Sequence, residues 1–182
     1  MKLRDNLITA LLAAVLCMIA PFALPLGPVP VTLATLGVYL TAALLGPWRG
    51  CAAVGLYLFL GGLGVPVFAG FTGGFPQLFG PTGGFLWGYL PCTLLVGYLT
   101  RRLPRPALLP LWLGVGAVVL TAAGTVGYMA HTGAPFWGAL AVCAAPVIPG
   151  ELIKIAAATG LILSLRGPLT RLTASGVKTE RL

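Results

Sequence analysis

Residues 149–154 of the chain read Pro-Gly-Glu-Leu-Ile-Lys, and they hold the only Glu and Lys that lie together inside apolar sequence. Proline followed by glycine before a helical run is typical of a helix start, because the N–H that proline lacks has no partner in the first turn. Glu151 and Lys154 are three residues apart, so they share one face of the predicted helix. Within a membrane-spanning segment such a pair is costly, which makes it a candidate functional site.

The same pair also has a purely structural interpretation. Glu151 near a helix N-terminus is stabilised by the helix dipole. Lys154 lies one turn further along, from where its amine can extend to the membrane interface. Local chemistry leaves a ligand site and a structural anchor as equal alternatives, so the rest of the chain has to decide between them.

The composition predicts an integral membrane protein with a single domain over residues 1–182. Hydrophobic residues make up 58% of the chain and charged residues only 8%, and the mean hydropathy is +1.01. These values exclude a soluble globular protein. The net charge of +8 comes from basic residues in short loops between apolar segments, a pattern typical of membrane topology and not of a nucleic-acid surface.

Six apolar segments are predicted to form membrane-spanning helices. They cover residues 7–24, 32–45, 51–63, 84–100, 107–130 and 149–165. A spanning helix needs about 20 residues, so the second and third segments are short unless they tilt or extend into their flanks. A seventh apolar stretch, residues 135–147, is interpreted as an interfacial or re-entrant segment.

The basic residues predict the orientation of these helices. They lie before the first segment, between the second and third, between the fourth and fifth, and after the sixth: Lys2, Arg4, Arg49, Arg101, Arg102, Arg105, Arg166, Arg171, Lys178 and Arg181. Because these connections alternate, every basic residue except Lys154 falls on one side of the membrane. The positive-inside rule then places both termini in the cytoplasm. The predicted fold class is an all-α bundle of six transmembrane helices, N-in and C-in.

The connections on the opposite side are rich in glycine and proline. They comprise residues 27–30, residues 61–84 and the approach to Pro149, and they hold no Lys, Arg, Asp or Glu. Irregular backbone near membrane depth is tolerated only where protein buries it or where it lines a cavity. We therefore expect these loops to form the wall and lid of an outward-facing pocket, with Phe68 of the long loop covering a ligand.

The residues that catalysis or metal binding would need are missing from the sequence. His131 is the only histidine, and Ser164 and Ser175 lie at or beyond the predicted cytoplasmic end, so a Ser-His arrangement is not expected. The glycines of residues 80–84 lack the Gly-Lys-Ser/Thr ending of an ATP-binding loop. One His and one Glu do not make a metal site. We predict no catalytic residue, metal or cofactor; an intramembrane enzyme using Glu151 is the least favoured alternative.

The first segment carries two alanines at a spacing that suits close helix packing. Ala10 and Ala14 are four residues apart, and small residues at this spacing let another helix approach closely. The neighbouring helix can belong to a partner protein or to the same bundle, and spacing alone does not distinguish these two possibilities.

Four motifs together resemble a known family. They are residues 27–33 (Gly-Pro-Val-Pro-Val-Thr-Leu), residues 64–68 (Gly-Val-Pro-Val-Phe), residues 80–84 (Gly-Pro-Thr-Gly-Gly) and residues 149–154. In this order they resemble BioY, the biotin-binding S component of energy-coupling factor (ECF) transporters. The resemblance runs from the first predicted helix to the sixth, and the four motifs are specific only in combination.

The resemblance implies a six-helix protein of a bacterial or archaeal plasma membrane that captures biotin from outside. It implies that a transmembrane T subunit and two ATPase subunits drive uptake, and that the Ala10 and Ala14 face docks onto the T subunit. It also implies that Glu151 and Lys154 hold biotin. An S component for another vitamin and a non-catalytic membrane scaffold are the alternatives.

Further ligand contacts are expected in or beside the motifs, at Thr32, Phe68, Thr82, Gly83 and Phe85. The chain also departs from the family, which usually has Asp at Glu151, Gln at Ala34 and Tyr at Phe85. Glu keeps the carboxylate but lengthens its reach by one methylene, while Ala34 and Phe85 remove polar partners. Which end of biotin meets Glu151 and which meets Lys154 stays open at this point.

Overall fold

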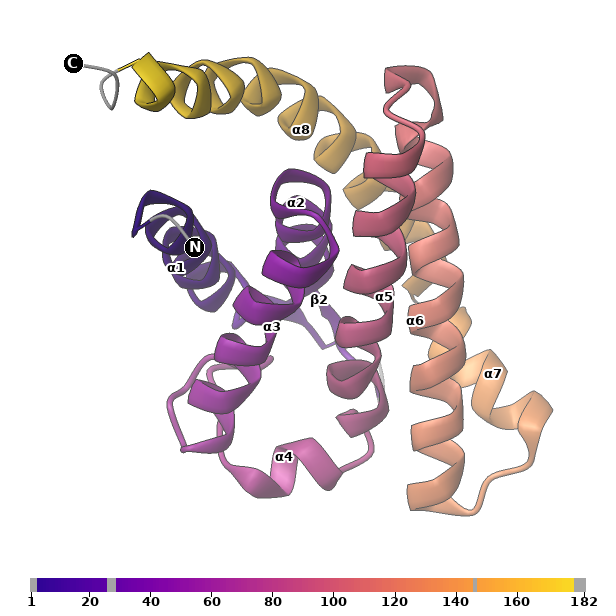
Figure 1. Ribbon diagram of the computed structural model, residues 1–182. Coiled ribbons are helices and arrows are strands. Elements are labelled where there is room, and N and C mark those ends of the chain that lie inside the picture. The colour runs from indigo at the N-terminus through magenta and orange to yellow at the C-terminus, as the bar shows by residue number, and fades with distance from the viewer. Residues whose placement is uncertain (1–2, 26–28, 146, 179–182) are drawn as a thin grey trace.

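The computed structural model describes residues 3–25, 29–145 and 147–178, apart from the side chains of Arg4 and residues 166–178. Gly27 and Pro28 of the first motif, and the basic side chains of both chain ends, therefore lie outside the described residues. The fold is mostly helical (Figure 1). Its elements are α1 (Leu3–Ile19), β1 (Ala23–Leu24), β2 (Val31–Thr32), α2 (Ala34–Leu45), α3 (Pro47–Gly62), α4 (Phe75–Phe79), α5 (Gly83–Arg102), η1 (Pro106–Leu108), α6 (Leu109–Thr132), α7 (Phe136–Ala144) and α8 (Val147–Lys178).

Helix α2 lies at the centre of the bundle. It packs against α1, α3, α5 and α8, and ten of its twelve residues are buried. A helix that is apolar on every side belongs in the interior of a protein. Any polar side chain on α2 is therefore held inside the bundle, where it needs a partner.

The predicted end of the first helix and the predicted start of the second helix are wrong. Helix α1 ends at Ile19 and not at residue 24, because Pro21 follows and restricts the backbone before it. The apolar residues Ala23 and Leu24 instead form β1, which pairs antiparallel with Val31 and Thr32 of β2. Helix α2 accordingly begins at Ala34 and not at residue 32. Apolar residues in a short hairpin look the same in sequence as the end of a helix.

The third and sixth predicted helices are too short. Helix α3 begins at Pro47, where proline fits the first turn, and so includes Arg49. Helix α8 continues from Val147 to Lys178, well beyond residue 165. Hydropathy marks the end of an apolar segment, whereas a helix can continue into polar sequence. The seventh apolar stretch contains α7, whose nine residues are too few to cross a bilayer.

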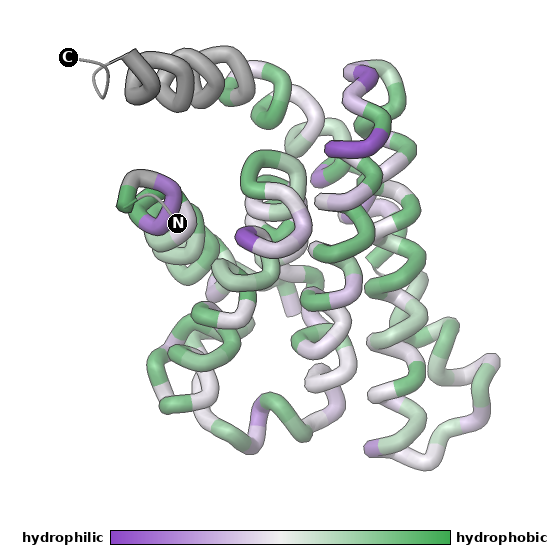
Figure 2. Tube along the Cα trace, viewed as in Figure 1, coloured by the Kyte–Doolittle hydropathy of each residue, from purple (hydrophilic) through white to green (hydrophobic). Residues whose placement is uncertain are grey.

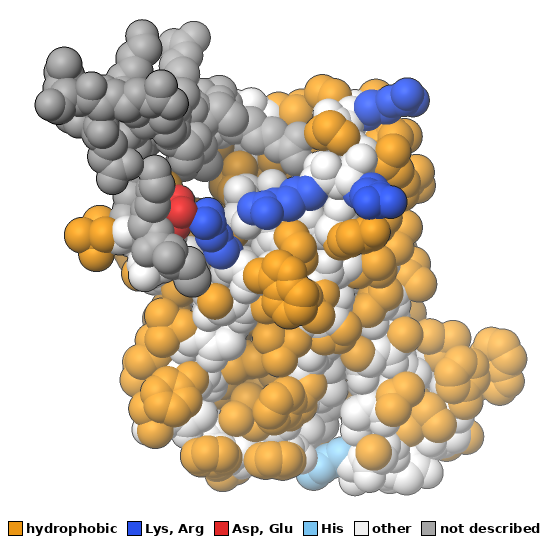
Figure 3. Space-filling view, in the orientation of Figure 1, with side chains coloured by type: hydrophobic (Ala, Val, Ile, Leu, Met, Phe, Trp, Pro, Cys, Tyr) orange, Lys and Arg blue, Asp and Glu red, His pale blue; other side chains and the backbone are white. Residues whose placement is uncertain are grey.

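Within the described part of the chain, two helical segments are long and apolar enough to cross a membrane. They are Pro106–Thr132 and Val147–Leu165; Asp5–Ile19 and α2 are apolar but shorter. Apolar residues cover most of the chain trace (Figure 2). In the space-filling view, Lys and Arg side chains gather in one band near the end of the molecule where α5 terminates (Figure 3).

Two arginines fasten this charged end. Arg49 of α3 forms an ion pair with Asp5 of α1 at 2.7 Å. Arg101 of α5 donates a hydrogen bond to the carbonyl oxygen of Leu45, the last residue of α2. Gly46, the single residue between α2 and α3, has a φ of +78° and lies against the Arg101 guanidinium. Glycine suits this position because it adopts positive φ without steric penalty and leaves room for the arginine.

Helices α5 and α6 approach each other at backbone distance beside the centre of the bundle. A Cβ atom on Gly84 would lie 2.6 Å from the carbonyl oxygen of Ala123 and 2.7 Å from the Cα of Gly127. Both neighbours are backbone atoms, so side-chain rotation cannot relieve the collision. This contact fixes the separation of the two helices.

We expect Gly84→Ala to lower the free energy of unfolding by about 1–3 kcal/mol, because the added methyl group forces α5 and α6 apart. Thermal unfolding of the purified protein in detergent measures this loss. Gly114→Ala is the matched control, since a Cβ on Gly114 of α6 meets nothing within 4 Å. Equal stability of the Gly84→Ala variant and the wild type would contradict the close contact.

Candidate functional site

A cavity of about 270 Å³ lies between β2, α2, the loop that carries α4, and the helices α5 and α8. It is several times larger than the roughly 30 Å³ that one water molecule occupies in the liquid. Its walls are mainly apolar and aromatic, with a few polar side chains at defined places. This combination is typical of a site for a small organic ligand.

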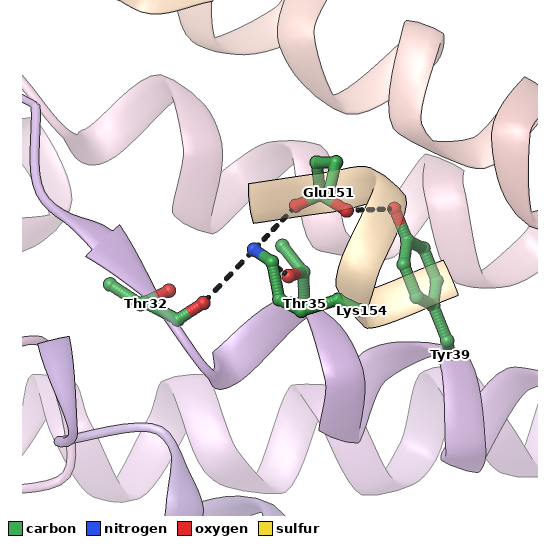
Figure 4. Close-up of polar contacts among 5 residues, drawn as sticks. All are labelled: Thr32, Thr35, Tyr39, Glu151 and Lys154. Carbon is green, nitrogen blue, oxygen red and sulfur yellow. Dashed lines mark hydrogen bonds and ion pairs between the residues drawn. The ribbon is translucent and has the colours of Figure 1, made fainter. Parts of the chain in front are cut away.

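Glu151 and Lys154 form a hydrogen-bonded cluster with three further residues, Thr32, Thr35 and Tyr39, beside the cavity (Figure 4). Lys154 Nζ donates to Glu151 Oε1 at 2.7 Å, to Thr35 Oγ1 at 2.6 Å and to the backbone oxygen of Thr32 at 3.1 Å. The Tyr39 hydroxyl donates to Glu151 Oε2 at 2.9 Å. The cluster thus joins α8 to β2 and α2.

Both charged side chains are almost completely buried, with Glu151 5% and Lys154 6% exposed. Buried charges are tolerated when they are paired and their remaining hydrogen-bonding groups are satisfied. An ammonium group has three donors, and all three of Lys154 are engaged. A carboxylate has about four lone-pair positions, of which protein donors occupy two. Glu151 can therefore accept further N–H groups, whereas an acceptor that reaches Lys154 has to displace a protein oxygen.

Aromatic side chains form much of the apolar wall of the cavity. Phe68 is buried and packs edge-on against Tyr57, with ring centroids 5.5 Å apart, and Tyr57 in turn contacts Tyr89 at 6.3 Å. The Phe68 ring lies directly against Gly61 of α3, where any side chain would collide with it. Aromatic pairs of this kind add to the energy of simple burial and hold the rings in place.

The loop between α3 and α5 contributes polar side chains to the cavity as well. Thr72, Gln77 and Thr82 line it from this loop. The Thr72 hydroxyl donates to the backbone oxygen of Ala69. A ligand would therefore meet polar groups on the loop as well as at Glu151 and Lys154.

The structure brings together most of the residues that the sequence singles out. The cavity is lined by Thr32, Phe68, Thr82, Phe85, Glu151 and Lys154. Gly83 is not among the lining residues; it is buried at the start of α5 and faces the carbonyl oxygen of Leu78, so its place is one of close packing. Ligand contact by these residues stays a prediction.

Thr35 and Tyr39 were missed by the sequence analysis. Both hydroxyl groups bond the charged pair from α2. Thr35 and Tyr39 are four residues apart and so lie on one face of α2. Without the fold, however, nothing connects this face to a helix more than a hundred residues away.

Ala10 and Ala14 both lie on the exposed face of α1, whereas Ala13 between them is buried. The two alanines therefore do not pack inside this chain, and the internal-packing interpretation of their spacing is wrong. Their face is available to another helix.

Among the described residues, no group of three or more His, Cys, Asp or Glu side chains is placed to hold a metal ion.

The fold is a bundle of apolar helices, two of them of membrane-spanning length, around a cavity of small-molecule size. The BioY family matches residues 1–171 of the chain. The chain belongs to the BioY family.

Individual relatives agree with this assignment. The chain is 42% identical to the biotin transporter BioY of Rhodobacter capsulatus over 154 residues, covering 77% of this chain and 80% of that protein. It is 32% identical to the biotin transporter BioY of Thermotoga maritima over 170 residues, covering 90% and 96%. It is also similar to the crystal structure of the S-component for biotin from an ECF-type ABC transporter. That comparison has a TM-score of 0.84 and 26% identity, over 91% of this chain and 92% of the other.

The buried pair gives a stability prediction that separates an anchor from a binding element. We expect Lys154→Met alone to lose about 3–5 kcal/mol, because it leaves the Glu151 carboxylate buried without its counter-ion. Adding Glu151→Leu should recover most of this loss, because apolar residues replace a buried ion pair with little change in stability. Thermal unfolding in detergent measures all three proteins. If the double variant is less stable than the single one, the pair is required by the fold itself.

Proposed function

We propose that this chain is the substrate-capturing membrane subunit of an ECF-type vitamin transporter and that its ligand is biotin. The observation that carries the proposal is the buried Glu151–Lys154 cluster beside a cavity of small-molecule size, in a chain of the BioY family. The relatives named above are biotin transporters, and the similar crystal structure is an S-component for biotin. The chain itself is then a transport subunit and not an enzyme, and biotin is its transported ligand and not a cofactor.

The chemistry of biotin suits this cavity. Biotin has an apolar bicyclic ring, a ureido group with two N–H donors and one carbonyl, and a chain that ends in a carboxylate. Phe68, Tyr57 and Phe85 offer apolar and aromatic surface to the ring system. The cavity places Glu151 and Lys154 together on one side, where a group carrying both donors and an acceptor can bind.

The state of the hydrogen bonds favours one orientation of the ligand. Glu151 has free acceptor positions, so it suits the ureido N–H donors. Lys154 is already saturated, so the ureido oxygen would replace its longest contact, the 3.1 Å bond to the Thr32 backbone oxygen. The valerate carboxylate would then point toward the loop side, near Thr72, Gln77 or Thr82. Thr32, Thr82 and Phe85 take part in this proposal as lining residues.

The membrane arrangement that we propose has six crossing segments, formed by α1, α2, α3, α5, α6 and α8. Helix α5 has 20 residues, which corresponds to about 30 Å and matches the hydrocarbon thickness. The basic residues Arg49, Arg101, Arg102 and Arg105 lie at the shared end of α3 and α5, and this supports a cytoplasmic location for that end. Both termini are then cytoplasmic, in a bacterial or archaeal plasma membrane.

The proposed partners are a transmembrane T subunit and two ATPase subunits. Ala10 and Ala14 are exposed on α1, and small residues at this spacing let another helix approach closely. We propose this face as the docking site for the T subunit.

Equilibrium binding of radiolabelled biotin to the purified chain in detergent tests the ligand and the site together. We expect tight binding by the wild type and a roughly thirtyfold or greater loss of affinity in Lys154→Ala, because truncating one member of a buried charged pair costs about 2 kcal/mol or more. Ile153→Ala is the matched control, since this neighbouring side chain is 73% exposed. Absence of biotin binding by folded wild type would contradict the ligand assignment, and other vitamins would then be tested.

A second experiment addresses the docking surface. Ala14→Leu should prevent co-purification with the T and ATPase subunits while leaving biotin binding by the isolated chain unchanged, because the larger side chain separates the two helices. Ala52→Leu, at an exposed position of α3, is the control of equal size. Co-purification of the Ala14→Leu variant at the wild-type level would place the interface elsewhere.

A further inference from the structure

The loop between α3 and α5, residues 63–82, has two chemically different faces. Toward the cavity it presents Thr72, Gln77 and Thr82 together with the buried ring of Phe68. Away from the cavity it presents three phenylalanines, Phe71, Phe75 and Phe79, which are 60%, 62% and 68% exposed. A loop that covers a pocket against water would carry polar side chains on its outer face, and this loop has the opposite arrangement.

The backbone at Phe71 holds its ring in this outward position. Phe71 has a φ of +58°, a left-handed conformation that a bulky side chain adopts at a cost of about 1–3 kcal/mol. Glycine would adopt it without strain. The ring packs edge-on against Phe22, itself exposed, with centroids 5.6 Å apart. The strained backbone conformation of Phe71 thus accompanies an aromatic pair, Phe22 and Phe71, on the outer surface.

The short helix α4 is fixed with its aromatic side outward. The indole of Trp87 donates to the Leu78 backbone oxygen at 3.1 Å, and its ring contacts Phe79 at 6.5 Å. Trp87 is itself 48% exposed. Figure 1 shows α4 at the end of the bundle where α6, part of a candidate spanning segment, also ends. Tryptophan and tyrosine are enriched at the membrane–water interfaces, and interfacial segments bury Trp, Phe and Leu side chains at the boundary of headgroups and acyl chains.

The loop and the parts of α3 and α5 beside it contain no charged side chain, whose hydration would favour exposure of the loop to water. Residues 50–100, which include all of the loop and most of α3 and α5, contain no Asp, Glu, Lys, Arg or His. A large exposed apolar patch on a protein marks a contact surface. Here the patch continues directly onto helices whose outer faces are apolar.

We propose that the outer face of residues 63–82 is immersed in the interfacial layer of the lipid bilayer, with Phe71, Phe75 and Phe79 inserted among the lipids. The cavity would then be closed on this side by a lid that has lipid on one face and the ligand on the other. This inference goes beyond the proposed function and is independent of which ligand the cavity binds.

Spin-label accessibility tests this proposal in the full chain. The four cysteines, Cys17, Cys51, Cys92 and Cys143, are first replaced by alanine. A nitroxide spin label is attached at Phe75→Cys. The matched control carries the label at Gln77→Cys, two residues further along α4 and on its cavity side. Val118→Cys, 70% exposed in the middle of α6, gives the lipid reference, and Arg105→Cys in the charged loop gives the water reference.

Each protein is reconstituted without ligand into phosphatidylcholine–phosphatidylglycerol vesicles. Collision rates are measured with oxygen, which concentrates in lipid, and with a water-soluble nickel chelate. We expect the oxygen-to-nickel ratio at Phe75 to exceed that at Arg105 and to approach that at Val118. The label at Gln77 should collide little with either reagent.

Three results would overturn the proposal. A ratio at Phe75 equal to that at Arg105 would place the loop in water. Low collision rates with both reagents at Phe75 would mean that protein, such as a second copy of the chain, covers it. Equal collision rates at Phe75 and Gln77 would contradict the claim that one face of the loop contacts lipid and the other faces the cavity. Phe79→Cys replaces the Phe75 variant if circular dichroism or gel filtration finds that variant misfolded. Because no ligand is added, the result does not depend on biotin binding.

Discussion

Lys154 lies inside an apolar helix bundle, and this is possible only because each of its three N–H donors has an oxygen to bind. Glu151 supplies one oxygen, Thr35 the second and the backbone of Thr32 the third. These partners come from α8, α2 and β2, so the three donors of one ammonium group meet oxygens from three distant parts of the chain. Tyr39 does the same for the carboxylate and brings a second turn of α2 into the cluster.

The surrounding fold supplies the conditions under which this cluster can act on a ligand. Helix α2 packs against four other helices, and Thr35 and Tyr39 are buried among them. In such a low-dielectric setting a satisfied polar cluster is rigid, and an unsatisfied group is expensive. Glu151 in place of the family's usual Asp reaches both Lys154 and Tyr39 with its two oxygens. The longer side chain is thus accommodated, and the ligand would complete a cluster that already has a fixed geometry.

Sequence reasoning predicted the helical membrane class and singled out Glu151 and Lys154, which the structure pairs beside the cavity, because hydropathy and the rarity of charge in apolar sequence are local properties. It also predicted glycine- and proline-rich connections around a pocket. It was wrong at the hairpin of β1 and β2, since Ala23 and Leu24 are apolar whether they end a helix or form a strand. It missed Thr35 and Tyr39 because their role depends on a contact between α2 and α8 that no spacing within α2 reveals. Gly83 was assigned to the site by its motif, although it packs beside the cavity and does not line it.

The central claim is that the Glu151–Lys154 cluster serves the ligand and is not needed to hold the fold together. The most direct test is the shift in unfolding temperature that excess biotin causes in the wild type and in the Glu151→Leu/Lys154→Met double variant. A ligand that binds only the native state raises its stability according to the ratio of ligand concentration to dissociation constant. We predict a clear upward shift for the wild type and none for the double variant, which should itself unfold cooperatively. An equal shift in both proteins would contradict the claim.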